Sequence, residues 1–134
     1  MNQINKKGET PIFACKYEKK NIVKSIIQYG TDINIVDNKG NTPLLISCYE
    51  DNDILFRVKM AVYLVKHEAN LNNANHNGKV LLHELYCYVN GNLINYYIKY
   101  GVDVNKRDNK GNTPLSIEHM KNNEIVIKCL IENE

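Results

Sequence analysis

The sequence has no tryptophan, only two phenylalanines and three prolines among its 134 residues. It has no long hydrophobic run either, because none approaches the roughly 18 apolar residues that a membrane-spanning helix needs. Residues 1–7 contain no apolar segment of the kind found in secretion signals. The formal net charge is only +2, so there is no global attraction to nucleic acid or to membranes. We therefore expect a soluble protein with no membrane partner.

The four cysteines lack the spacing of a metal site or a disulfide framework. Cys15, Cys48, Cys87 and Cys129 are 33, 39 and 42 residues apart, and no C-x-x-C pair occurs. A zinc knuckle or a disulfide framework needs closer or paired cysteines. We expect small buried thiols in a reducing compartment, so the location is predicted to be cytoplasmic or otherwise intracellular.

Motifs for catalysis are also missing. The histidines His67, His76, His83 and His119 have no metal-ligand spacing, and no glycine-rich phosphate loop or nucleophile elbow occurs. Cys87 follows His83 by four residues, which permits a thiol–imidazole pair on one helix face, but no third group supports it. We predict that the protein is not an enzyme, has no cofactor or metal, and takes no small-molecule substrate.

The sequence does contain an internal repeat. The stretch Lys39–Leu44, KGNTPL, recurs unchanged at Lys110–Leu115, with a related copy KGETPI at Lys7–Ile12 and an eroded copy NGKVLL at Asn77–Leu82. The glycines of these copies stand at 8, 40, 78 and 111, so the spacings are 32, 38 and 33. A period near 33 indicates stacked structural units, which serve mostly as surfaces that hold other molecules.

Each copy predicts the start of a helix. Thr10, Thr42 and Thr113 are each followed by proline, a pair typical of a helix N-cap and the first helical position. Val80 stands at the same place in the third copy and has no hydroxyl, so we expect that helix to fray. In the second copy, Asp53 is expected to cap a lengthened second helix.

Helix ends and turns are also encoded. Gly30 and Gly101 follow apolar runs and are predicted to end helices with a backbone in the left-handed region. Glu68 stands at this position in the second copy, where a residue other than glycine destabilises the left-handed conformation by about 1 kcal/mol. The distance from these residues to the next cap position is 12 in each case: 30 to 42, 68 to 80 and 101 to 113. About 20 residues separate a cap from the next such glycine, which is room for two short helices. Asp37 and Asp108 are typical of side-chain-closed turns within the 12-residue links.

These motifs resemble the ankyrin repeat. The opening Gly-x-Thr-Pro-Leu matches Gly8–Ile12, Gly40–Leu44 and Gly111–Leu115, and the hairpin entry matches Gly30–Asn34, Gly101–Asn105 and, more weakly, Glu68–Asn72. The resemblance covers nearly the whole chain. It implies an all-α fold, a short α-solenoid of four ankyrin-type helix–turn–helix repeats with projecting β-hairpin or finger loops. We expect one domain over 1–134, with repeats at approximately 8–39, 40–77, 78–110 and 111–134.

The third and fourth repeats depart from the family pattern. A small pair in the first helix, kept as Ser47-Cys48, becomes Leu85-Tyr86 and Glu118-His119. Larger groups there are expected to push neighbouring repeats apart or tilt them, and we expect repeat three to be the most distorted. His83 falls at the histidine position of the family motif, so we expect it to bond to backbone near the next hairpin.

The resemblance implies a non-catalytic protein–protein interaction module, or scaffold, that binds a partner protein through the concave face of fingers and inner helices. By alignment with the variable positions of the family, the predicted partner-binding residues are Val36, Asn38, Lys39, Asn41, Tyr49, Glu50, Ala74, His76, Asn77, Lys79, Tyr88, Arg107, Asn109, Lys110, Asn112 and Lys121. The basic finger residues favour a partner with an acidic face, although plain solubilising charge explains them equally well.

Two other functions remain open at this stage. The array could be a regulatory or targeting arm of a larger protein, or a structural array that dimerises through its apolar last helix. A monomer is favoured, and nucleic acid is not expected as a partner because no stripe of aromatic and basic residues occurs. Asn34, Asn72 and Asn105 occupy the position that asparaginyl hydroxylases modify in similar repeats, so their modification is an open question.

Overall fold

The computed structural model describes residue 10 and residues 20–48, 53–84 and 91–134. The chain divides into two compact units, Met1–Asn70 (unit 1) and Leu71–Glu134 (unit 2), and each is treated by itself. In the described residues every regular element is a helix and none is a strand. The all-α class is therefore confirmed, and the fingers are hydrogen-bonded loops rather than paired strands.

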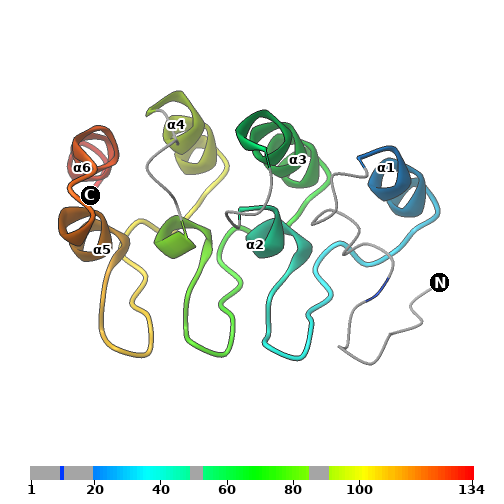
Figure 1. Cartoon of the computed structure of the whole chain (residues 1–134), viewed down its shortest axis with the longest axis horizontal. Helices are drawn as coiled ribbons and strands as arrows, with labels where there is room; N and C mark the ends of the chain where they lie inside the picture. Colours follow the sequence, from blue (N-terminus) through cyan, green and yellow to red (C-terminus); the bar gives the residue numbers. More distant parts are fainter. Residues whose placement is uncertain (1–9, 11–19, 49–52, 85–90) are drawn as a thin grey trace. The chain divides into compact units, whose positions relative to one another are not determined.

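Unit 1 contains three described helices: α1 (Lys20–Gln28), α2 (Pro43–Ser47) and α3 (Ile54–Lys66). Helix α2 packs against α3, and a loop projects from the α2 side of the pair (Figure 1). The core between these helices is formed by Leu44 and Leu45 of α2 with Met60 and Leu64 of α3, which are at most 1% exposed. Burial of such side chains contributes roughly 1.5–3 kcal/mol each, so packing rather than helix propensity holds the five-residue α2 in place.

Unit 2 contains the 3₁₀ helix η2 (Leu81–Glu84) and the helices α4 (Gly91–Lys99), α5 (Pro114–Met120) and α6 (Glu124–Ile131). Helix α5 contacts η2 and α6, and α4 contacts α6. Within this unit, η2 and α5 form the layer from which the loops project, and α4 and α6 form the layer behind it (Figure 1). The core between the layers is made by Leu82, Ile94, Tyr97, Val126 and Leu130, all at most 1% exposed.

The predicted helix starts are present wherever the structure describes them. The Oγ1 atoms of Thr42 and Thr113 each accept the backbone N–H three residues later, at 3.3 Å, and proline follows in both cases. The Asp53 carboxylate accepts the N–H of Phe56 at 3.1 Å and begins α3. In the third repeat, which has Val80 at the cap position, the first helix is the four-residue η2. Thr10 is buried, but the helix expected after it lies outside the described residues.

The second helices end as the sequence predicts. Gly30, Glu68 and Gly101 have φ of 80°, 68° and 88°. At the latter two ends, the next residue donates its N–H back to the helix, from Ala69 to the carbonyl of Leu64 at 3.0 Å and from Val102 to that of Tyr97 at 3.1 Å. This hydrogen-bond pattern satisfies carbonyls that the helix itself leaves free, and it turns the chain into the next loop.

Asparagine side chains link consecutive repeats within each unit. In unit 1, Asn34 donates to the carbonyl of Glu68 at 3.4 Å and accepts the N–H of Asn70 at 2.7 Å. In unit 2, Asn72 donates to the carbonyl of Gly101 at 2.9 Å and accepts the N–H of Asp103 at 2.7 Å. Each amide therefore bonds to the backbone on both sides of the left-handed turn in the following repeat.

This bridge predicts a difference between two equivalent asparagines. Asn72→Ala removes two hydrogen bonds and should lower the free energy of unfolding by about 1–2 kcal/mol. Asn105 occupies the same position one repeat later, and its exposed side chain has no hydrogen bond to the residues that the structure describes, so Asn105→Ala should cost less than about 0.5 kcal/mol. Urea denaturation of both variants tests this, and equal losses would contradict the bridge.

Candidate functional site

Three loops project from the first-helix layers of the two units. We call them finger 1 (residues 32–41, in unit 1), finger 2 (residues 71–79) and finger 3 (residues 103–112), the last two in unit 2. Each finger is closed by one polar side chain at an equivalent position: Asp37, Asn75 and Asp108. Its Oδ1 atom accepts the backbone N–H groups two and four residues later. These turns are the elements that position the candidate binding residues.

Finger 3 shows the geometry of this turn in full. Oδ1 of Asp108 accepts the N–H groups of Lys110 at 2.9 Å and Asn112 at 2.8 Å, and Oδ2 accepts the Asn112 side-chain amide at 3.2 Å. The Asp108 N–H donates to the Asn112 carbonyl at 2.9 Å, and Gly111 closes the turn with φ of 81°. Four N–H groups at the tip, those of Asp108, Lys110, Gly111 and Asn112, are therefore bonded within the finger, which orders this turn.

The charge of Asp108 takes part in this turn. Burial of its carboxyl group acts to raise the pKa, but hydrogen bonds from the backbone and side chain of Asn112 and from the backbone of Lys110 lower it. The net result is a pKa below the usual value for aspartate. The ionised carboxylate is thus the form that the folded finger prefers.

His83 has the structural role that the sequence predicts. Its side chain is 1% exposed, its Nδ1 accepts the N–H of Val80 at 3.0 Å, and its Nε2 lies 3.1 Å from the carbonyl of Asn112. These partners require a ring with the hydrogen on Nε2, because Nδ1 accepts while Nε2 faces an acceptor. His83 thus holds the start of η2, which has no threonine cap, and ties it to finger 3. Cys87 lies outside the described residues.

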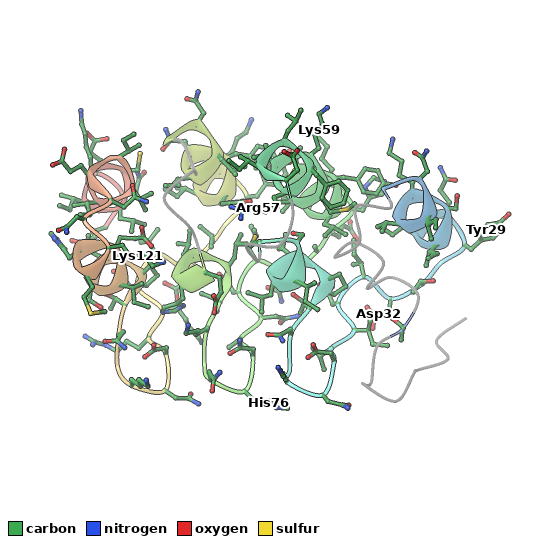
Figure 2. The ribbon with its side chains drawn as sticks, in the orientation of Figure 1. Tyr29, Asp32, Arg57, Lys59, His76 and Lys121 are labelled. Atoms are coloured by element: carbon green, nitrogen blue, oxygen red, sulfur yellow. The ribbon has the colours of Figure 1, made fainter. Side chains whose placement is uncertain are left out.

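Most of the predicted binding residues lie on exposed parts of the fingers. Exposed members of the set are Val36, Asn38, Lys39, Ala74, His76, Asn77, Arg107, Asn109, Lys110 and Lys121. Figure 2 shows His76 at the far end of finger 2, away from the helices. Lys79 and Asn112 are half-buried. Tyr49, Glu50 and Tyr88 lie outside the described residues.

Several members of the predicted set have partners inside their own unit. Asn41 is only 4% exposed, and its side chain donates to the Asp37 carboxylate at 3.2 Å. Asn112 makes the equivalent bond to Asp108. Lys79 pairs with Glu84 at 3.2 Å, and Lys121 with Glu118 at 3.1 Å. Intramolecular bonds already use the polar groups of these four residues, and their role in partner binding stays a prediction.

Glu118 is a structural residue that the sequence reasoning misjudged. We expected the larger side chain at this small-residue position to push repeats apart. The Glu118 side chain is instead fully buried, and its carboxylate accepts the Lys121 ammonium at 3.1 Å and the Asn123 amide at 2.9 Å. It thereby holds the turn between α5 and α6, where Asn122 has φ of 56°. The lysine three residues later and the asparagine five residues later were the available signal.

A connection between fingers 2 and 3 was also missed. The side-chain amide of Asn109 donates to the carbonyl of His76 at 2.8 Å, and its backbone N–H donates to the carbonyl of Asn77 at 3.0 Å. Gly78 allows this approach, because a Cβ atom there would lie 2.7 Å from the Asn109 nitrogen. Asn109 was predicted as a partner contact, and in the structure it also joins the two fingers of unit 2.

A cluster of metal ligands and a membrane-spanning helix are both absent from the described residues. Among them, no three His, Cys, Asp or Glu side chains gather closely enough to hold a metal ion. Within the same residues, no helix is both long and apolar enough to cross a bilayer.

Paired short helices, left-handed turns at fixed intervals and side-chain-closed fingers define a helical repeat protein. The family model described as ankyrin repeats in three copies matches residues 1–75, more than half of the sequence. The chain therefore belongs to the ankyrin repeat family, as its motifs predict. Proteins of this family are generally protein-interaction modules without enzymatic activity.

Several relatives are ankyrin repeat proteins of poxviruses. The chain is similar to putative ankyrin repeat protein FPV031 of fowlpox virus, with 31% identity over 131 residues, covering 92% of this chain and 37% of that protein. It is also similar to ankyrin repeat protein OPG189 of variola virus, with 25% identity over 122 residues, covering 85% of this chain and 21% of that protein. A 46-residue segment is 46% identical to fowlpox putative ankyrin repeat protein FPV230, covering 34% of this chain and 24% of that protein. The chain thus spans between about a fifth and two fifths of these relatives.

The turn of finger 3 predicts a pH-dependent contribution to stability. In Asp108→Asn the turn itself should survive, because Asn75 builds the same turn in finger 2. Loss of the charge should lower the free energy of unfolding by about 1 kcal/mol at pH 7, since hydrogen bonds to charged groups are the stronger ones. A carboxyl group whose pKa is depressed on folding stabilises the protein above its unfolded pKa of about 3.9 and loses that effect as pH falls through the lower folded value.

Unfolding free energies of the two proteins, measured by urea denaturation between pH 2 and pH 7, test this expectation. The difference between native protein and Asp108→Asn should be largest above pH 5 and should shrink towards zero as Asp108 is protonated. A difference that stays constant across the range would contradict the assigned role of the charge.

Proposed function

We propose that this chain is a non-catalytic module that binds a partner protein through its fingers and the adjoining first helices. The observation that carries the proposal is the closure of each finger by its own side chain. Because Asp37, Asn75 and Asp108 each accept two backbone N–H groups of their own finger, we infer that the outward side chains are presented on ordered loops. Ordered loops on a fixed scaffold are the usual carriers of binding residues, and pre-ordering lowers the entropy lost on binding.

The proposed binding surface consists mainly of the exposed finger residues. These are Val36, Asn38 and Lys39 on finger 1, Ala74, His76 and Asn77 on finger 2, and Arg107, Asn109 and Lys110 on finger 3. Tyr49, Glu50 and Tyr88 stay in the proposed set on sequence grounds alone, and Lys79, Asn112 and Lys121 lie at its margin. Asn41 is left out because it is buried. We further propose that the chain forms one domain of four repeats, and that it acts inside the cell.

A second candidate function is a targeting or regulatory arm of a larger protein. The relatives are longer than this chain, which spans 37% of one and 21% of another. A module of this kind would use the same fingers, and its partner would set where the larger protein acts. Self-association through α6 is a weaker alternative, supported by the exposure of Ile125 and Ile131, at 60% and 53%.

The proposal is tested with a partner captured from cell lysate, identified by mass spectrometry and then purified. A finger variant combining Lys39→Ala, His76→Ala and Lys110→Ala should bind it at least about tenfold more weakly, as expected for the loss of several contacts. A matched control combining Lys59→Ala, Lys66→Ala and Lys99→Ala alters exposed residues of α3 and α4 and should bind within about twofold.

Melting temperatures of both variants should stay within about 2 °C of the native protein, because all six side chains lie on the surface. Calorimetric titration gives the dissociation constants. Full affinity in the finger variant, or a loss confined to the helix control, would place the binding surface elsewhere.

A further inference from the structure

Fingers 2 and 3 are joined at their tips, and we call this pair, residues 71–79 and 103–112, the double finger. Two hydrogen bonds make the connection: Asn109 Nδ2 to the His76 carbonyl at 2.8 Å, and Asn109 N–H to the Asn77 carbonyl at 3.0 Å. Each finger is also closed internally, by Asn75 and by Asp108. The relative position of the two tips is therefore fixed before any partner arrives.

The double finger has a clear excess of positive charge. Lys106, Arg107 and Lys110 are exposed, and in the part of the chain that the structure describes they make no ion pair. One further finger cation, Lys79, is already paired with Glu84.

The acidic residues of the double finger offset part of this charge: four cations (Lys79, Lys106, Arg107 and Lys110) against two aspartates leave a formal charge of +2. Its two aspartates accept hydrogen bonds from the finger backbone, Asp103 from Asn105 at 2.9 Å and Asp108 from Lys110 at 2.9 Å. The Arg107 guanidinium is oriented by a bond from Nη1 to the Gly111 carbonyl at 2.9 Å. That bond leaves most of its N–H donors free.

We propose that the double finger is a docking site for an acidic peptide segment of a partner protein, with Lys106, Arg107 and Lys110 as the charge contacts and Asn109 as a positioning residue. This inference rests on the proposed function and adds to it the chemistry of the partner. Carboxylates are the natural counterpart of a forked guanidinium and two ammonium groups. His76 and Asn77, whose carbonyls bond to Asn109, also have exposed side chains that can bond to a peptide backbone.

A peptide fits this surface better than a nucleic acid does. The double finger contains no phenylalanine, tyrosine or tryptophan on which bases could stack. The net charge of the whole chain is only +2, whereas nucleic-acid binding usually depends on many phosphate contacts. Three exposed cations, one of them an arginine oriented by its bond to Gly111, suit a short run of aspartates and glutamates.

The first test measures charge recognition with the full-length chain. The probe is a fluorescein-labelled 12-residue peptide rich in glutamate and aspartate, compared with its glutamine and asparagine counterpart by fluorescence anisotropy at 50 and 300 mM salt. The acidic peptide should bind more tightly than the amide peptide, and more weakly at the higher salt. Lys106→Glu/Arg107→Glu/Lys110→Glu should weaken its binding by about tenfold or more.

The control for this test carries the same change in net charge. Lys59→Glu/Lys66→Glu/Lys99→Glu reverses three exposed cations on α3 and α4 and should change affinity less than about threefold. An equal loss in both triple variants would mean that general attraction explains the binding, and this overturns the docking site.

The second test isolates the connection between the fingers. Asn109→Ala changes no charge but removes the bond to His76, so it should weaken acidic-peptide binding severalfold by loosening the two tips. The amide proton of residue 109 should also exchange faster with solvent, because its bond to Asn77 is less well held. Asn95→Ala changes an exposed asparagine of α4, outside the fingers, and should leave acidic-peptide binding unchanged. Unchanged binding by Asn109→Ala overturns the positioning role.

The outcomes separate this inference from the proposed function. In one outcome, a captured partner binds the finger variant (Lys39→Ala, His76→Ala and Lys110→Ala) more weakly, but the acidic peptide binds the native protein no better than the amide peptide does. The proposed module function then stands, and the proposal of an acidic segment is overturned. If a 12-nucleotide single strand binds more tightly than the acidic peptide and responds to the same charge reversal, the surface is a nucleic-acid site and the proposal is overturned. The proposal is supported if acidic-peptide binding is lost in Lys106→Glu/Arg107→Glu/Lys110→Glu and kept in the control triple variant.

Discussion

The rest of this structure depends on one interaction, the pair of hydrogen bonds that a side-chain oxygen accepts from the backbone of its own finger. In finger 3, Oδ1 of Asp108 gathers the N–H groups of Lys110 and Asn112, and equivalent atoms act in fingers 1 and 2. This closure fixes the path between a left-handed helix end and the following helix cap, which are 12 residues apart in each repeat. Helix length can then vary between repeats without altering the loops, because the link has one preferred shape.

Order in the fingers connects the fold to binding. A loop whose backbone is satisfied internally loses little freedom when a partner arrives, so side chains such as His76 and Lys110 can contribute more of their contact energy. The Asn72 bridge and the buried His83 extend this order from the fingers to the helices of unit 2. The proposed site is thus an extension of the packed repeats, and we expect it to bind a partner through hydrogen bonds and ion pairs.

Local sequence signals predicted much of the fold because each one acts within a few residues. The caps at Thr42 and Thr113, the positive φ of Glu68 and the bond from His83 to the next finger are all present. What was missed depends on residues that the chain brings together over a distance. The bond from Asn109 to His76 joins residues 33 apart.

Two further errors came from treating exposure and size as properties of a single position. Glu118 is buried because Lys121 and Asn123 satisfy its carboxylate. Asn41 is buried because it belongs to the turn of Asp37.

The central claim, that the fingers are ordered before binding, is tested most directly by amide hydrogen exchange of the free, full-length chain. The N–H groups of Lys39, Asn41, Lys110 and Asn112 should exchange at least about tenfold more slowly than in an unstructured peptide. Exchange at unstructured rates would contradict it.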